Sequence, residues 1–136
     1  MNTIELDEAK LPEILDAIPQ DKPIVMLNLL KFNQDTNYSD SSSYESCRGE
    51  EAYNERYLKN AAEKIHGIGG EIVYDGNVCV EVVGENKEGW DRIIVVRYPS
   101  IALFMQMVST PEYVAIREHR AAALEDSRLI ATVENG

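Results

Sequence analysis

The sequence predicts an α+β fold in which an antiparallel β-sheet carries helices on one face. One observation is segment 90–98, WDRIIVVRY, which has the pattern of a strand with apolar side chains on both faces. A second is the order of strand-like and helix-like segments along the 136 residues. A chain of this length can cover one face of a sheet with helices, so the question is what covers the other.

The N-terminal part predicts a short helix and then the first strand. Segment 6–18 ends before Pro19 and carries aliphatic residues at helical spacing: Leu11, Ile14, Leu15 and Ile18. Segment 24–32, IVMLNLLKF, has a strand pattern. Segment 33–49 is polar and rich in serine, and we expect a mobile insertion, either a plain flexible loop or a lid.

The middle of the chain predicts a helix followed by two strands. Helix 50–66 is expected to end at Gly67, and its buried stripe recurs every four residues: Tyr53, Tyr57, Ala61 and Ile65. Segment 71–84 has a strand pattern that a turn or bulge interrupts at 75–77. A turn at 85–89 leads into the strand 90–98.

The C-terminal part predicts two helices and a last strand. Ser100 is a suitable cap for helix 101–108, while Thr110 and Pro111 are typical of the start of a second helix that runs to about residue 124. The last strand is expected at 128–134.

This order gives one ferredoxin-like domain, β-α-β-β-α-β, spanning residues 1–136 behind a short N-terminal helix. The two helices of that arrangement lie on the same face of an antiparallel sheet. The strands are apolar on the opposite face as well. We therefore expect a homodimer in which two sheets pack face to face about a two-fold axis.

Composition excludes several kinds of partner. The net charge of −11 argues against binding to nucleic acid or to an anionic membrane surface. Neither a long apolar run nor a signal-peptide pattern is present, and we expect a cytoplasmic protein. Cys47, in a polar loop, and Cys79, in a strand, are expected to be inert thiols. No metal-binding spacing, phosphate loop or dinucleotide fingerprint appears, so we expect no metal or cofactor.

Several segments together resemble the family called domain of unknown function 1330. They are VMLNLLKF at 25–32, Gly69-Gly70, Trp90-Asp91, RYPS at 97–100, Phe104, Met107, PEY at 111–113, HRAAAL at 119–124 and DSRLI at 126–130. The resemblance implies a dimeric α+β barrel, a fold that also includes cofactor-free monooxygenases, haem-degrading enzymes, chlorite-dismutase-like proteins and small-molecule isomerases. It supplies no reaction, because the function of the family is not established.

Arg120 is the most informative side chain in the sequence. It shares the apolar stripe of its helix with Ile116 and Leu124, so its guanidinium is expected to turn inward, where an unpaired charge is costly. Two interpretations stay open. The partner is either a structural carboxylate (from Asp91, Glu112 or Asp126) or a bound anionic ligand.

Other polar residues have similar alternatives. Asn28 in mid-strand either binds a ligand or has a structural role, pairing with a neighbouring backbone or across the dimer interface. Tyr57 and Tyr98 either complete the core or line a pocket near Arg120. Arg117 is either solvated or the second half of an anion clamp.

Asp91 follows Trp90 in the predicted strand. As a partly buried carboxylate it would be a general base, and otherwise it makes a turn or an ion pair. His119, between Glu118 and Arg120, is expected to face solvent or the partner chain, and neither it nor His66 is placed like a haem ligand.

Two functions fit these residues. In the first, the protein is a cofactor-independent enzyme, similar to a monooxygenase or an isomerase, that acts on an anionic metabolite between sheet and helices. Asp91 and Arg120 would be catalytic, and Asn28, Tyr57, Tyr98 and Arg117 would bind the ligand. In the second, the protein is a binding or structural dimer in which these residues complete internal hydrogen bonds.

Overall fold

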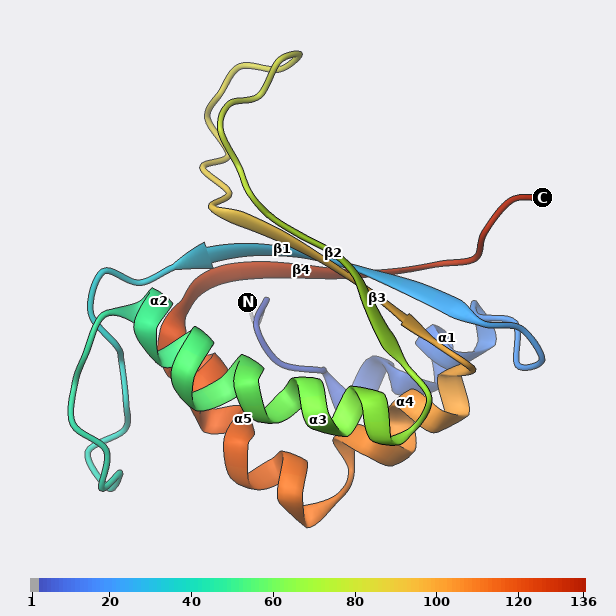
Figure 1. Cartoon of the computed structure of the whole chain (residues 1–136), viewed down its shortest axis with the longest axis horizontal. Helices are drawn as coiled ribbons and strands as arrows, with labels where there is room; N and C mark the ends of the chain where they lie inside the picture. The colour runs from blue at the N-terminus through green and yellow to red at the C-terminus, as the bar shows by residue number, and fades with distance from the viewer. Residues whose placement is uncertain (1–2) are drawn as a thin grey trace.

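An antiparallel sheet of four strands, in the order β2-β3-β1-β4, forms one layer of the protein (Figure 1). The computed structural model describes residues 3–136. The strands are β1 (Ile24–Phe32), β2 (Glu71–Asn77), β3 (Arg92–Tyr98) and β4 (Leu124–Thr132). Strand β1 is central and pairs antiparallel with both β3 and β4. The chain is therefore an α+β protein with the ferredoxin-like order, which confirms the predicted fold class.

The helices lie on one side of this sheet (Figure 1). Two of them begin where the sequence predicts: the Ser100 side chain accepts a hydrogen bond from Leu103 N, and the Thr110 side chain accepts one from Tyr113 N. The helical elements are η1 (Glu8–Lys10), α1 (Leu11–Asp16), α2 (Gly49–Glu51), η2 (Ala52–Leu58), α3 (Lys59–Gly67), α4 (Ile101–Val108) and α5 (Pro111–Ala123).

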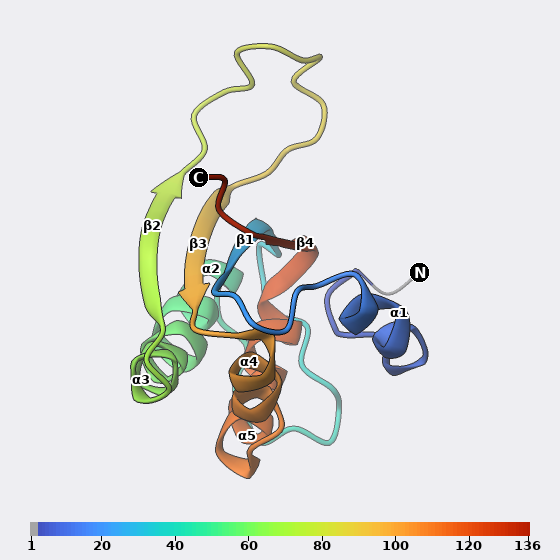
Figure 2. The ribbon, with the colours of Figure 1, turned by 90° about the vertical axis from the view of Figure 1, so that its right-hand side faces the viewer.

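The predicted helix 50–66 forms as one continuous run, α2-η2-α3, but its middle part is a π-helix rather than an α-helix. At the end of this run Gly69, rather than Gly67, takes the left-handed backbone conformation, with φ of +83°. Helix α1 lies beside β4 at one side of the sheet (Figure 2), and a cavity of about 100 Å³ separates the end of α1 from residues 131–133.

Three strands differ in their bounds from the prediction: β3 begins at Arg92 rather than at residue 90, and β2 and β4 differ by more. Strand β2 ends at Asn77, and residues 78–91 form a loop that projects from the sheet on the side away from the helices (Figures 1 and 2). Cys79 consequently lies in this loop, exposed, and not in a strand. Strand β4 begins at Leu124, directly after α5, because Leu124 is buried and pairs with Phe32 across an irregularity in the ladder.

The face of the sheet toward the helices carries the core. Alternate residues of β1 and β3 are buried there against Tyr53, Tyr57, Ala61 and Ile65 of the helical run: Ile24, Met26, Leu30, Ile94, Val96 and Tyr98. The burial of that helical stripe confirms its prediction from the every-fourth-residue pattern.

The opposite face, here called the open face, is also apolar. The intervening residues of the two central strands lie on it, and each is half-buried by its neighbours alone: Val25, Leu27, Leu29, Ile93 and Val95. At its two edges Tyr74 of β2 is 58% exposed and Ile130 of β4 is 45% exposed. An apolar surface of this kind on a single chain indicates an interaction site.

The first described residues of the chain run against β4 and α5. The Ser127 hydroxyl, buried in β4, donates a hydrogen bond to the Thr3 carbonyl oxygen at 2.6 Å. Ile4 packs at the margin of the core. Within residues 3–136 no helix has both the length and the apolarity needed to cross a membrane.

Candidate functional site

The guanidinium of Arg120 is half-buried between α5 and the π-helix. Its Nη1 donates a hydrogen bond to the Ile4 carbonyl oxygen at 2.5 Å, and the Tyr53 hydroxyl lies close enough to influence its pKa. Burial disfavours the charge, but attraction to the hydroxyl groups of Tyr57, Tyr53 and Tyr113 outweighs it, so the pKa of Arg120 is raised above its ordinary value. Arg120 therefore stays a cation at any physiological pH.

Four tyrosines surround this cation, and three of them form a continuous set of rings. The Tyr57 and Tyr113 hydroxyl oxygens are 2.6 Å apart, and the ring centroids of Tyr53 and Tyr57 are 5.1 Å apart. Tyr98, at the end of β3, is buried and packs its ring edge-on to Phe104. The predicted inward position of Arg120 and the burial of Tyr57 and Tyr98 are thus what the structure shows.

Burial keeps the phenols protonated. It raises the pKa of Tyr53 to about 12, although the nearby Arg120 charge lowers it. Burial also raises the pKa of Tyr57 and of Tyr98 well above the ordinary value for a phenol, and the neighbouring Tyr113 adds to both shifts. At neutral pH the cluster therefore presents a guanidinium and several neutral O–H groups, which are the groups that bind an anion.

The π-helix places two of the tyrosines and also fixes the neighbouring element. Tyr53 and Tyr57 both lie in η2, and Asn54 between them accepts a hydrogen bond from Arg92 Nη1 at 2.5 Å. Arg92 in turn makes a bidentate pair with Asp75, so η2, β2 and β3 are held together. π-helical turns are rare and occur frequently at functional sites. On an α-helix, residues four apart are displaced by about 40° around the helix axis at each step, so a buried stripe with this spacing would not stay on one face. The four-residue spacing of the buried stripe was therefore the signal in the sequence that favoured a wider helix.

None of the three expected carboxylates pairs with Arg120. Asp126 pairs with Arg128, 2.7 Å away, the Asp91 carboxylate accepts a hydrogen bond from Phe32 N, and Glu112 is exposed. Among residues 3–136, Arg120 forms no ion pair with any carboxylate. The structural partner that the sequence suggested is replaced by a backbone carbonyl and by hydroxyl groups.

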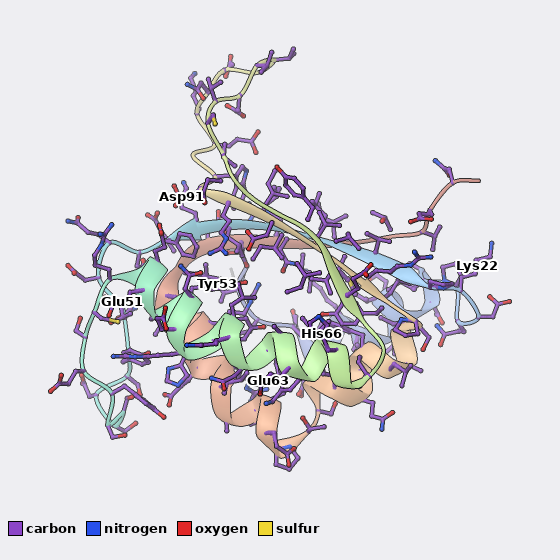
Figure 3. All side chains as sticks on the ribbon, viewed as in Figure 1. Lys22, Glu51, Tyr53, Glu63, His66 and Asp91 are labelled. Atoms are coloured by element: carbon purple, nitrogen blue, oxygen red, sulfur yellow. The ribbon has the colours of Figure 1, made fainter. Side chains whose placement is uncertain are left out.

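Asp91 is not the partly buried carboxylate of the prediction. It is exposed and precedes β3, and its hydrogen bond to Phe32 N, 2.8 Å long, extends the pairing between the two strands. Figure 3 shows it at the base of the projecting loop, whereas Tyr53 points into the space between helices and sheet. A separate open cavity of about 380 Å³ is lined by Asp91 together with Arg48, Glu50 and Asn77, and Arg120 does not line it.

The remaining predicted site residues have separate positions. Asn28 lies on the helix-facing side of β1, and its Nδ2 donates to the Ile94 carbonyl oxygen at 3.1 Å, the backbone pairing that was one of its two alternatives. Arg117 is exposed on α5. The structure therefore brings together Arg120, Tyr57 and Tyr98, but not Asp91 or Arg117.

A second cluster was missed in the sequence. His119, expected to face solvent or a partner, is only 4% exposed, and its Nδ1 lies 2.7 Å from the Tyr38 hydroxyl. Arg56 donates to the same hydroxyl at 3.0 Å, and the Tyr44 ring packs edge-on to the imidazole. Burial lowers the pKa of His119. These contacts attach the serine-rich segment to α5. The only signal for them in the sequence was the presence of two tyrosines, Tyr38 and Tyr44, in that otherwise polar segment.

Within residues 3–136, no group of three or more His, Cys, Asp or Glu side chains is placed to hold a metal ion. The residues around Arg120 likewise offer donors and a cation, not metal ligands.

Comparison with solved structures finds proteins that share the fold of this chain, one of which is also similar in sequence. The protein RPA0582 of unknown function from Rhodopseudomonas palustris is 29% identical, with 100% of this chain and 99% of that chain covered and a TM-score of 0.88. Its methylated form is 30% identical over 98% of this chain and 95% of that chain, with a TM-score of 0.87. The hydroxynitrile lyase of Passiflora edulis is 15% identical over 85% and 95% of the two chains, with a TM-score of 0.52, so it shares the fold alone.

No curated protein matches the chain. The family described as Domain of unknown function (DUF1330) matches residues 42–133, which include the helical run α2-η2-α3, strands β2, β3 and β4, and the whole of α5 with Arg120. The chain belongs to the DUF1330 family.

Proposed function

We propose that the protein binds a small carboxylate-bearing molecule at Arg120, between sheet and helices, and that it does so as a homodimer. The observation that carries the first part is the guanidinium of Arg120, which is half-buried between α5 and the π-helix with no carboxylate partner among residues 3–136. A partly buried cation without a counter-charge is costly to keep, and a ligand carboxylate would reduce that cost.

The surrounding hydroxyls support the same ligand chemistry. The hydroxyls of Tyr53, Tyr57 and Tyr113 are grouped around the guanidinium, and one or more of them would donate to the second oxygen of a carboxylate or to an oxyanion that develops from a carbonyl. Such a site suits an isomerase-like or monooxygenase-like reaction without a cofactor. Among residues 3–136 no carboxylate pairs with Arg120 to act as its base, and Asp91 lies at a separate cavity. Arg120 and the surrounding tyrosines would therefore bind the ligand and stabilise its charge. Asp91 could accept a proton only from a molecule bound in the separate cavity of about 380 Å³ that it lines.

Entry of a ligand requires the N-terminal segment to move. The Ile4 carbonyl oxygen now occupies the position next to Arg120 Nη1 that a ligand oxygen would take. In the alternative function, a structural or non-catalytic dimer, this carbonyl is the permanent partner of the guanidinium. The two functions differ in whether a small carboxylate competes with Ile4.

The test is a thermal-shift and calorimetric titration with benzoate, acetate and inorganic phosphate. Wild-type protein should bind a carboxylate, Arg120→Met should lose at least tenfold in affinity, and Arg120→Lys should recover only part of it. Arg117→Met is the matched control, because it removes the same charge from the same helix at an exposed position. Equal affinity in Arg120→Met and wild type, or no binding by the wild type, would favour the structural function.

The homodimer rests on the open face. Five half-buried aliphatic side chains, with the exposed Tyr74 and Ile130 at the edges, form one apolar surface, and contiguous apolar surfaces mark interaction sites. Two copies related by a two-fold axis would bury this surface against itself. Sedimentation equilibrium at micromolar concentration tests it, and a stable monomer would contradict it. A cytoplasmic location stays a prediction, with which the two free thiols agree.

A further inference from the structure

Residues 78–91, here called the arm, have no function in the site described above. The arm leaves the ends of β2 and β3 and continues away from the helices in both views (Figures 1 and 2). At its base, Val78 N donates to the Asp91 carbonyl oxygen, and the Arg128 guanidinium lies 5.2 Å from the Trp90 ring centroid. The base of the arm is thus attached to the sheet.

The tip has a defined turn of its own. Glu81 N donates to the Asn86 side chain, and Asn86 itself takes the left-handed conformation, with φ of +57°. Lys87 pairs with Glu85, so the tip makes its hydrogen bond and its ion pair within the arm. Even so, Val82 is 91% exposed and Val83 is 94% exposed. A built turn that presents two adjacent β-branched side chains to solvent is typical of a surface that another molecule covers.

The length of the arm indicates which molecule covers its tip. Each leg has about seven residues, which span up to roughly 23 Å when extended. Two sheets packed face to face are only about 10 Å apart. Because the arm rises on the same side as the open face, it would pass the interface of the proposed dimer and reach the flank of the second copy.

The charges of the arm fit the same partner. Apart from Lys87, its charged residues are acidic: Glu81, Glu85, Glu88 and Asp91. An anionic membrane or nucleic acid would repel it. The open face, in contrast, carries the exposed cation Arg97, whose register partner in β1 is Val25 of that face. A second copy of this chain therefore presents at least one exposed cation to an acidic arm that crosses the edge of its open face.

We propose that the arm of each subunit clasps the second copy of this chain, with Val82 and Val83 buried on the partner's flank. The inference rests on the proposed homodimer and adds to it a second, separate contact. By symmetry each dimer has two arms, so a change at the tip acts twice in each complex.

The experiment is sedimentation of the full chain carrying Val82→Asp and Val83→Asp. Both sites are exposed in the single chain, so the variant should keep its far-UV circular dichroism, while its dimer dissociation constant should rise at least 100-fold. The matched control is Val114→Asp, on the outer side of α5, where we expect a change below threefold. An unchanged dissociation constant in the arm variant would overturn the inference.

A second readout uses the exposed thiol of the arm. In a Cys47→Ser background, an environment-sensitive fluorophore on Cys79 should emit at shorter wavelength in the dimer and shift to longer wavelength on dilution. An emission maximum that is the same at all concentrations would contradict the clasp. The experiment separates an error about the arm from an error about the dimer. If only the arm inference is wrong, the wild-type protein is a dimer and Leu27→Asp, on the open face, still dissociates it. If the proposed dimer is wrong, the wild-type protein is already monomeric.

Discussion

Leu27 occupies the centre of the open face, so its replacement tests the proposed dimer most sharply. It lies in the central strand β1, with Val95 of β3 and Ile130 of β4 as register partners. In the single chain it is half-buried by these neighbours. We predict that Leu27→Asp separates the subunits and leaves each of them folded.

The size of the effect follows from symmetry. Burial of a carboxylate in place of a leucine costs at least about 2 kcal/mol per copy, from lost apolar burial and from desolvation. A two-fold interface contains the substitution twice, which gives about 4 kcal/mol and a dissociation constant raised roughly 1,000-fold. The stability of the isolated subunit should fall by only about 1 kcal/mol, since Asp is a poor strand residue at a site that stays partly exposed.

Sedimentation velocity over a range of concentrations measures this effect, and urea unfolding of the dissociated subunit measures its stability. Ile14→Asp in α1 introduces the same charge at an exposed aliphatic site on the helical side of the molecule and should leave the association unchanged. If Leu27→Asp associates as tightly as wild type, the open face is not the interface. The reasoning from sheet polarity would then be wrong.

Three further predictions concern the interior. Tyr57→Phe and Tyr113→Phe should each destabilise the fold by about 1–2 kcal/mol, and the double variant by less than their sum, because either single change leaves one buried hydroxyl unpaired; urea unfolding as a double-mutant cycle measures this. Burial lowers the folded-state pKa of His119, so the unfolded chain binds its proton first as the pH falls, and stability should drop below about pH 6.5; this drop should be weaker in His119→Gln, and an identical profile would contradict it. Gly49→Ala should cost at least about 2 kcal/mol, because its Cβ would collide with the carbonyl oxygens of Asn33 and Ala123, whereas Gly67→Ala, in open space on α3, should stabilise slightly in thermal unfolding.

Local signals in the sequence were sufficient for much of the fold. Strand β1 and helix α4 have the predicted bounds, since a run of apolar residues and a capping Ser100 define them without help from distant contacts. The inward position of Arg120 followed from helical spacing in the same way. These features depend on the spacing of apolar residues along the chain, and that spacing can be read directly from a single sequence.

The errors have long-range causes. The alternating valines of 78–83 imitate a strand, but β3 offers them no pairing partner beyond Asp91. Arg120 meets Ile4, a contact that spans 116 positions of the chain and depends on where the N-terminal segment packs. His119 is buried by the serine-rich segment, whose path over α5 has no periodic signal. The π-helix had a weak signal, the four-residue spacing of its tyrosines.

The measurement that tests the central claim most directly is a crystal structure of the dimer grown with 4-bromobenzoate, with anomalous scattering to locate the bromine. Our account predicts an anomalous peak between α5 and the sheet, with the carboxylate bound to the Arg120 guanidinium and the Ile4 carbonyl displaced from it. Saturating ligand with no peak there, and Ile4 still hydrogen-bonded to Arg120, would contradict it.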